Sequence, residues 1–389
     1  MKFPYTHFLE EKLWEIANEW DETEDYSLAL TFLNSKDSFR SFGDGLLSII
    51  QKKYPSEKLS SDNVIPFLYK QCETTGVDIS EIASHNTLVN WFKKGVRPKK
   101  GEASRQAMFA LAFSLQLNLD ETKNLFHRVY LDRAFNYRSY DELIYYFCLK
   151  NKKIWKDAQK LIHSIQPDAI HLTDITKNTI VIKKDVEQLI DEAELVYYIN
   201  SHWYNFEKNS VTATETFKRL LHEAKRVAFE EINLPENREN FKGKWIHGNE
   251  ISSNLLFEVI TEINVTGNRG TKTVFNNVNL SKEIKNRFPE ALTFSKKDMC
   301  SEERRKSIIL LFSYITWYKS QWLDIEYDFD DYISQLDSLL FDCNYAGLYY
   351  GNPFDWLFLF CAQAERPLDM FRDIIQEVFE QVESTKVTD

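Results

Sequence analysis

The stretch SHNTLVNWFKKGVRPKK, residues 84 to 100, joins an apolar helix pattern to a dense group of cations. Five cations fall within eight residues of a chain whose formal net charge is −11: Lys93, Lys94, Arg97, Lys99 and Lys100. A Trp-Phe pair at 91 and 92 precedes Gly95 and Pro98, an order typical of a helix that stops and turns. We therefore predict a helix over 86–94 that ends in a basic turn.

The residues around this stretch predict further short helices separated by tight turns, from 59 to about 165. VIPFLYKQCETTG (64–76) has the periodicity of an amphipathic helix that ends at Gly76, and DISEIAS (78–84) predicts one short helix. SRQAMFALAFSLQL (104–117) is nearly all apolar, with Ser104 as a candidate N-cap. A helix without a polar face is expected at the centre of a core.

Residues 60–130 resemble the helix-turn-helix domains of the Xre (phage repressor-like) family. The resemblance lies in a set of matching elements: Ile82-Ala83, Thr87-Leu88, Trp91, Gly95, Arg97-Pro98 and the apolar helix 104–117. The interval from Ala83 to Leu88 is shorter than in the family and lacks the family's turn glycine. We expect either a remodelled turn or a second helix that is placed differently.

The resemblance implies a binding surface for double-stranded DNA. Amide and hydroxyl side chains on the outer face of the second helix would read base edges, and they are Asn86, Thr87 and Asn90. The five cations from Lys93 to Lys100 would neutralise phosphates, while Leu88 and Trp91 would face the core. In the alternative interpretation, the cations form a solvated helix end where they suit the helix dipole.

The composition predicts an all-α, multi-helical protein. Of 389 residues, 43% are hydrophobic and only 11 are Gly and 9 Pro, which disfavours turn-rich β-folds. We predict an N-terminal helical segment (1–58), in which Gly43-Asp44-Gly45 forms the turn before a helix, and an Xre-like module with an extension (59–165). A larger helical domain (166–389) would follow, with an irregular or small β insertion within 233–282.

Two segments of similar pattern suggest a duplicated helix–loop–helix. LFHRVYLDRAFNYRSYDELIYYFC (125–148) resembles LFDCNYAGLYYGNPFDWLFLFC (340–361). Each carries an aspartate, Asp141 or Asp355, that we expect in the first turn of an apolar helix, where a carboxylate suits free N–H groups. The aromatic run after Pro353 is interpreted as core packing, with a partner interface as the alternative.

Motifs for catalysis, metals and nucleotides are incomplete throughout the chain. His222-Glu223 lacks the second histidine of a zinc protease motif, since Arg226 stands in its place. The acidic run 324–335 has Phe329 where a calcium loop needs glycine. We expect no metal, no cofactor and no enzymatic activity, although a catalytic site assembled from distant residues stays open.

Cysteine use and hydropathy predict a cytoplasmic protein that does not enter membranes. The 5 cysteines are scattered, which fits a reducing compartment, and no apolar run reaches the length of a membrane span. The preferred function is a DNA-binding transcriptional regulator of bacterial or mobile-element type. Its C-terminal domain would bind an effector or a protein partner, or form homo-oligomers. The alternative is a non-enzymatic interaction protein, such as a phage-defence or signalling component that binds a protein partner.

Overall fold

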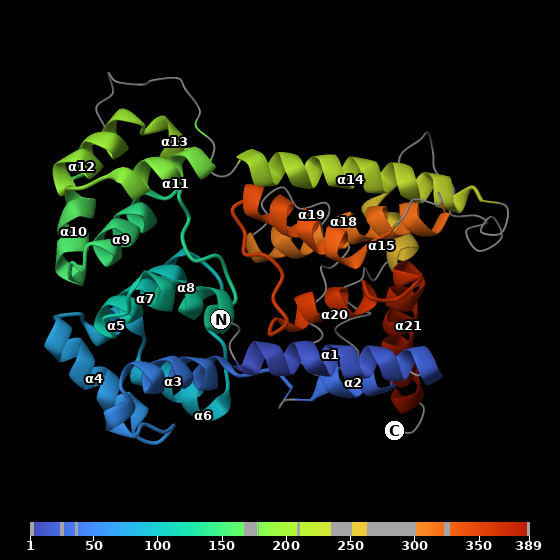
Figure 1. Cartoon of the computed structure of the whole chain (residues 1–389), viewed down its shortest axis with the longest axis horizontal. Helices are drawn as coiled ribbons and strands as arrows, with labels where there is room; N and C mark the ends of the chain where they lie inside the picture. Colours follow the sequence, from blue (N-terminus) through green and yellow to red (C-terminus); the bar gives the residue numbers. More distant parts are fainter. Residues whose placement is uncertain are drawn as a thin grey trace. The chain divides into compact units, whose positions relative to one another are not determined.

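The computed structural model describes residues 4–23, 27–35, 38–166, 177, 179–207, 211–234, 251–262, 301–322 and 327–386 (Figure 1). Within these residues the chain forms 19 α-helices, one 3-10 helix and one π-helix, and no strand. The predicted all-α fold is therefore confirmed. No helix in the described ranges combines the length and hydropathy needed to cross a bilayer.

The chain folds as two compact units. Unit 1 contains residues 1–39, 214–340 and 347–389, and unit 2 contains residues 40–213 and 341–346. This division differs from the three consecutive ranges predicted above, because the N-terminal helices pack with C-terminal ones. In unit 1, for example, the ring of Phe32 lies 4.8 Å from that of Trp356. Residues 179–207, assigned above to the C-terminal domain, belong to unit 2.

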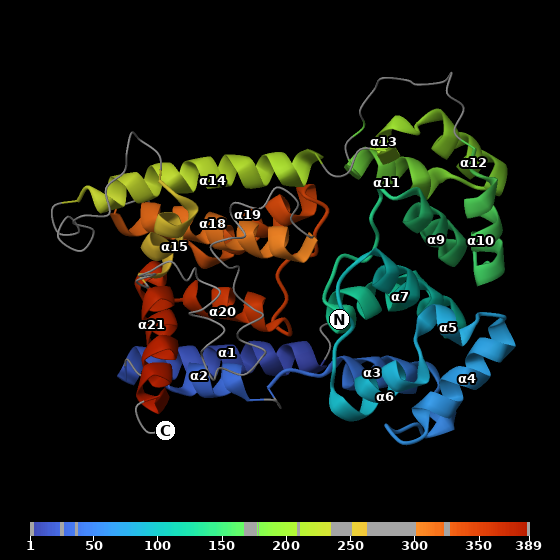
Figure 2. The same cartoon turned by 180° about the vertical axis from the view of Figure 1, so that it is seen from behind.

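Unit 2 is a helical array centred on one apolar helix (Figures 1 and 2). Its elements are α3 (Phe42–Lys53), η1 (Pro55–Glu57), α4 (Val64–Thr75), α5 (Ile79–Ile82), α6 (His85–Lys94), α7 (Glu102–Ser114), α8 (Leu119–Asn124), the π-helix η2 (Leu125–Tyr130), α9 (Tyr140–Lys150), α10 (Trp155–Ser164), α11 (Thr179–Gln188), α12 (Glu192–Ser201) and α13 (Tyr204–Glu207). Helix α7 is the predicted central helix: Phe109 is fully buried against the rings of Phe126 and Tyr145. Ser104 is not its N-cap, since α7 already begins at Glu102, after Gly101.

Helix α3 packs closely on α6 at Gly43, a residue predicted above to lie in a turn before the helix. The helix begins at Phe42, with the Ser41 hydroxyl accepting the N–H of Asp44, so the predicted turn over 43–45 lies inside the first helical turn. A Cβ added at Gly43 would lie 2.2 Å from the carbonyl oxygen of Trp91. The glycine thus permits a backbone-to-backbone contact between the two helices, which lie side by side in Figures 1 and 2.

Unit 1 is built around buried aromatic side chains. Its helices are α1 (Pro4–Thr23), α2 (Ser27–Asn34), α14 (Val211–Ile232), α15 (Ser253–Thr261), α18 (Ser301–Trp322), α19 (Phe329–Asp342), α20 (Pro353–Cys361) and α21 (Pro367–Lys386). Trp317 of α18 contacts the rings of Tyr332, Phe358 and Phe371. Every α20 residue from Phe354 to Cys361 is buried, which confirms the core interpretation of the aromatic run.

The predicted irregular insertion contains a helix. Within 233–282, the segment Ser253–Thr261 forms α15, whose side chains from Leu255 to Thr261 are buried. Its N-cap is Ser252, which accepts the N–H of Leu255. The apolar sequence NLLFEVI, placed behind a serine cap, explains this helix. Most of the remaining insertion, 235–250 and 263–282, lies outside the described residues.

Each unit contains one buried ion pair of the same design. In unit 2, Arg105 of α7 binds both carboxylate oxygens of Glu142 of α9, at 2.7 Å each. In unit 1, Arg305 of α18 binds both oxygens of Asp355 of α20, at 2.8 Å each. Each acid is the third residue of its helix, and each also accepts a backbone N–H from six residues upstream.

This shared ion pair supports the expected duplication, but it shifts the alignment of the two segments by one residue. The residue that corresponds to Asp355 is Glu142, one position after the predicted Asp141. Both aspartates do lie in the first turn of their helices. Asp355, however, uses its carboxylate for Arg305 and the N–H of Tyr349. Burial raises the pKa of Asp141, whose Oδ1 is buried without a hydrogen-bond partner.

Candidate nucleic-acid interface

The predicted helix pair exists, with an unusually short connection. Helix α5 is only four residues long and begins with the Asp78 side chain accepting the N–H of Ser80. Only Ala83 and Ser84 separate it from α6, and the Ser84 hydroxyl caps α6 by accepting the N–H of Thr87. The short interval noted in the sequence is therefore a turn reduced to one extended residue and one N-cap.

Helix α6 has one buried face that holds it rigidly. Leu88, Trp91 and Phe92 are buried, as the helical period of the sequence predicts. The indole of Trp91 packs edge-to-face on Phe42 of α3, with ring centroids 4.9 Å apart. Together with the contact at Gly43, this packing fixes the orientation of the opposite face.

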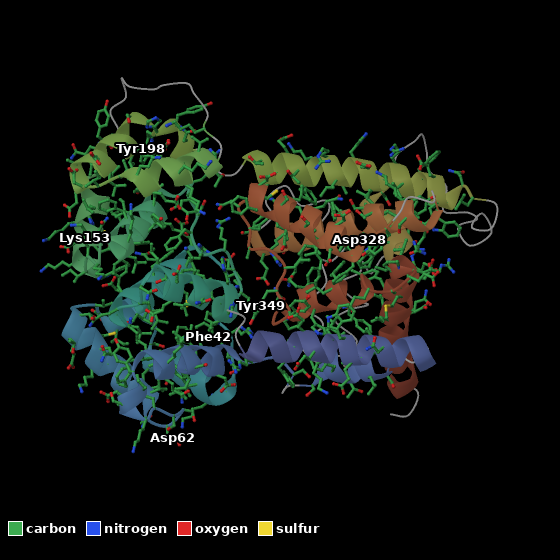
Figure 3. All side chains as sticks on the ribbon, viewed as in Figure 1. Phe42, Asp62, Lys153, Tyr198, Asp328 and Tyr349 are labelled. Carbon is green, nitrogen blue, oxygen red and sulfur yellow. The ribbon has the colours of Figure 1, made fainter. Side chains whose placement is uncertain are left out.

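The opposite face of α6 carries amides and a cation. Asn86 and Lys93 are exposed and Asn90 is half-buried, and their spacing of four and three residues places them in one row. Lys93 forms an ion pair with Asp62, an exposed residue of the loop before α4 (Figure 3). Thr87 lies off this row, and its hydroxyl is 2.9 Å from that of Ser84. Among the predicted base-reading residues, Asn86 and Asn90 thus share a face and Thr87 belongs to the cap.

The basic turn after α6 is anchored by two of its own cations. Gly95 ends α6 in the left-handed conformation (φ 65°). Arg97 donates to the carbonyl of Val129 at 2.9 Å and to that of Arg40. Lys100 donates to the carbonyl of Tyr130 and lies 3.9 Å from the centre of that ring. Sequence reasoning assigned both residues to phosphates, whereas their contacts hold the turn against η2.

Lys94 and Lys99 are the cations that this anchored turn displays. Both side chains are exposed, and no ion pair of either is found among the described residues. The hydroxyl of Tyr130 donates to the carbonyl of Lys99 at 3.3 Å, which ties the backbone here to η2 as well. The turn therefore presents two cations on a fixed backbone.

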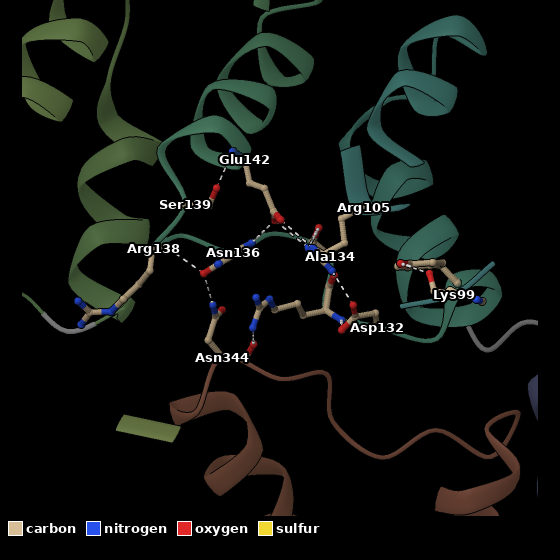
Figure 4. Close-up of polar contacts among 11 residues, drawn as sticks. Lys99, Arg105, Asp132, Ala134, Asn136, Arg138, Ser139, Glu142 and Asn344 are labelled. Atoms are coloured by element: carbon tan, nitrogen blue, oxygen red, sulfur yellow. Dashed lines mark hydrogen bonds and ion pairs between the residues drawn. The ribbon is translucent and has the colours of Figure 1, made fainter. Parts of the chain in front are cut away.

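Behind the turn lies the buried cluster around Arg105, in the first turn of α7 (Figure 4). Besides Glu142, Arg105 binds Asp132 at 2.8 Å and the carbonyl of Arg133 at 3.0 Å. The segment 341–346 reaches the same loop, where the Asn344 amide donates to Asn136 Oδ1 at 2.8 Å. Loop 131–136, which directly follows η2, is thus held from two sides.

The cluster makes the stability of unit 2 sensitive to acid. Burial alone would raise the pKa of Asp132, but Arg105, Lys100 and Arg133 lower it to about 2. Because the folded pKa lies below the ordinary value, the ionised carboxylate stabilises the fold above about pH 4, and this contribution is lost as the pH falls through 2. The contribution is about 2 kcal/mol.

We expect Asp132→Asn to remove this part of the acid sensitivity. Between pH 4 and 2, the wild-type free energy of unfolding should fall by about 2 kcal/mol more than that of the variant. Urea denaturation at pH 4, 3 and 2 measures the difference, with the exposed Asp120→Asn change as the control that keeps the wild-type slope. Parallel pH profiles for Asp132→Asn and the wild type would contradict the prediction.

Electrostatically, unit 2 differs from the chain as a whole. It contains 24 Lys and Arg against 22 Asp and Glu, whereas unit 1 contains 24 against 37. The net charge of −11 therefore originates in unit 1, and the unit with the basic turn is slightly basic. Overall acidity is thus no obstacle to a polyanion that binds unit 2.

Comparison of the chain with protein-family models, with curated proteins and with solved structures found no match. The Xre resemblance thus stays a prediction, based on the residues of α5–α7. Sequence reasoning missed the anchoring roles of Arg97 and Lys100 and the buried Arg105. The carbonyls that these side chains bind are 28 to 57 residues away along the chain, beyond the reach of any local pattern.

Proposed function

We propose that unit 2 binds double-stranded DNA through α6 and the basic turn, and that the chain is a transcriptional regulator of bacterial or mobile-element type. The observation that carries this proposal is the row Asn86, Asn90 and Lys93 on the outer face of a helix whose inner face is locked by Trp91. An asparagine amide can donate to and accept from an adenine edge in the major groove. A fixed helix presents such amides in one register.

In this proposal the cations contribute affinity for any DNA sequence and do not distinguish one sequence from another. Lys94 and Lys99 would contact phosphates directly, and Lys93 would do so by exchanging Asp62 for a phosphate. An exposed pair such as Lys93–Asp62 is worth at most about 1 kcal/mol, so this exchange costs little. Arg97 and Lys100 would position the turn. Unit 1 would act as the effector-binding or oligomerisation part of the regulator.

Reversing the charge of the turn tests the proposal. For Lys94→Glu/Lys99→Glu we expect duplex affinity to fall about tenfold or more, and the slope of log K against log salt to become about 2 units shallower. Fluorescence anisotropy with a labelled 20-base-pair duplex of mixed sequence, titrated at 50 to 200 mM NaCl, measures both quantities. Lys70→Glu/Lys184→Glu, which changes two exposed lysines elsewhere on unit 2, is the charge-matched control.

A second pair of variants separates base reading from phosphate binding. Asn86→Ala/Asn90→Ala should keep the salt slope and reduce the difference in affinity between a duplex selected from random sequences and an unselected one. If the wild-type chain does not bind duplex at 50 mM NaCl, the DNA-binding proposal is wrong.

One observation favours the alternative function, binding of a protein partner. On unit 2, Ile190 and Tyr197 are 79% and 75% exposed; Ile190 lies just before α12 and Tyr197 on it, with the exposed Ala193 between them along the chain. Large exposed apolar side chains close together on a surface are typical of protein-binding sites. A purified partner that is lost with Tyr197→Ser, but retained with Lys94→Glu/Lys99→Glu, would place protein binding ahead of DNA binding.

A further inference from the structure

Helix α10 carries a row of basic side chains on its exposed face. Its buried face contains Trp155, Ala158 and Leu161. The exposed face carries basic side chains at intervals of four and three residues, Lys156, Lys160 and His163. The exposed Lys152 lies before the helix, in the turn between α9 and α10. Three of these residues, with Gln159 and Ser164, line a shallow open hollow along the helix.

This row differs from an ordinary solvated helix surface. On α14, Lys218 pairs with Glu215 at 3.0 Å and Arg226 with Glu230 at 2.8 Å, the usual neutralisation between successive turns. The acid within α10 is Asp157, which accepts the N–H of Ile154 at the start of the helix. No ion pair of Lys152, Lys156 or Lys160 occurs in the part of the chain that the structure describes.

The row begins beside the helix pair of the candidate interface. The indole N–H of Trp155 donates to Glu81 of α5 at 2.8 Å, which joins the first residue of α10 to α5. Because α6 follows α5 after only Ala83 and Ser84, this bond ties α10 to the helix pair of the candidate interface. Figure 1 shows the first turn of α10 directed toward α5, with the rest of the helix leading away from it.

We propose that the row Lys156, Lys160 and His163, with Lys152 in the turn before it, is a second phosphate-binding surface, which extends the contact of unit 2 with a duplex beyond α5 and α6. Lys156 and Lys160 are displaced by about 6 Å along the helix axis, so the row can follow a sugar–phosphate backbone. A surface of this kind adds affinity and salt dependence without reading sequence. The inference rests on the proposed DNA binding.

Charge reversal on α10 in the full chain tests the inference. Lys156→Glu/Lys160→Glu should weaken binding to a 30-base-pair mixed-sequence duplex about tenfold at 100 mM NaCl, and should make the salt slope about 2 units shallower. On a 10-base-pair duplex, about 34 Å long, the loss should stay below about twofold, since α6 and the turn alone can cover it. Lys70→Glu/Lys184→Glu again serves as the charge-matched control, and both pairs of side chains are exposed, so we expect the fold to be retained.

The outcomes separate this inference from the proposed function. If wild-type protein binds the 30-base-pair duplex and Lys156→Glu/Lys160→Glu binds it equally well, the second surface is wrong and the proposed function stands. An equal loss on both duplex lengths would also overturn the extension. If the wild type binds neither duplex, the proposed function itself fails, and the inference with it.

Discussion

Replacing Arg105 by methionine should lower the free energy of unfolding of unit 2 by about 3 to 5 kcal/mol. The guanidinium binds Glu142 in a bidentate pair and also Asp132, and all three groups are largely removed from water. Methionine fills a similar volume but leaves two carboxylates buried without their counter-charge. The loss therefore exceeds what the removed hydrogen bonds alone would give.

Arg305→Met provides a matched variant, because its partner Asp355 is only 1% exposed. Hydrogen–deuterium exchange with mass spectrometry can localise each effect. Arg105→Met should speed exchange in α7 and α9, and Arg305→Met in α18 and α20. Arg226→Met, at an exposed site of α14, should change the unfolding free energy by no more than about 0.5 kcal/mol. Exchange in α7 and α9 that matches the wild type would contradict a structural role for the Arg105 cluster.

The parts of the fold that local sequence determines were predictable. Helix α6 follows from its apolar period and its Gly95 stop, and the inward direction of Leu88 and Trp91 follows from the same period. The buried character of α7 and α20 follows from their lack of a polar face. Each of these predictions depends on residues within one or two helical turns of each other.

Features that depend on distant residues were not predictable. The basic stretch around Arg97 looks the same in the sequence whether its side chain binds a phosphate or the carbonyls of Arg40 and Val129. Only the tertiary fold decides between these contacts. The discontinuity of unit 1 has the same origin, since nothing in residues 1–39 indicates that they pack with α20. The row on α10 is visible in the sequence, but its lack of acidic partners depends on which faces of neighbouring helices are buried.

Gly43→Ala should destabilise unit 2 by about 2 to 3 kcal/mol, although alanine is the better helix former. The added Cβ would lie 2.2 Å from the carbonyl oxygen of Trp91 and 2.9 Å from the Cα of Phe92. Both contacts are with backbone atoms, so no side-chain rotation relieves them. Helices α3 and α6 would have to move apart, which opens the core around Phe42.

Gly45→Ala is the matched control for this change, because it lies on the same helix and gains the same helix propensity. Its Cβ would meet the side chain of Val129 at 3.1 Å, and small adjustments of that side chain relieve the contact. We expect Gly45→Ala to stay within about 1 kcal/mol of the wild type. Urea denaturation followed by tryptophan fluorescence compares the two variants, since Trp91 lies at the affected contact. Equal stability of Gly43→Ala and Gly45→Ala would show that α3 and α6 do not need backbone contact, and the fixed orientation of α6, on which the row of Asn86 and Asn90 depends, would lose its support.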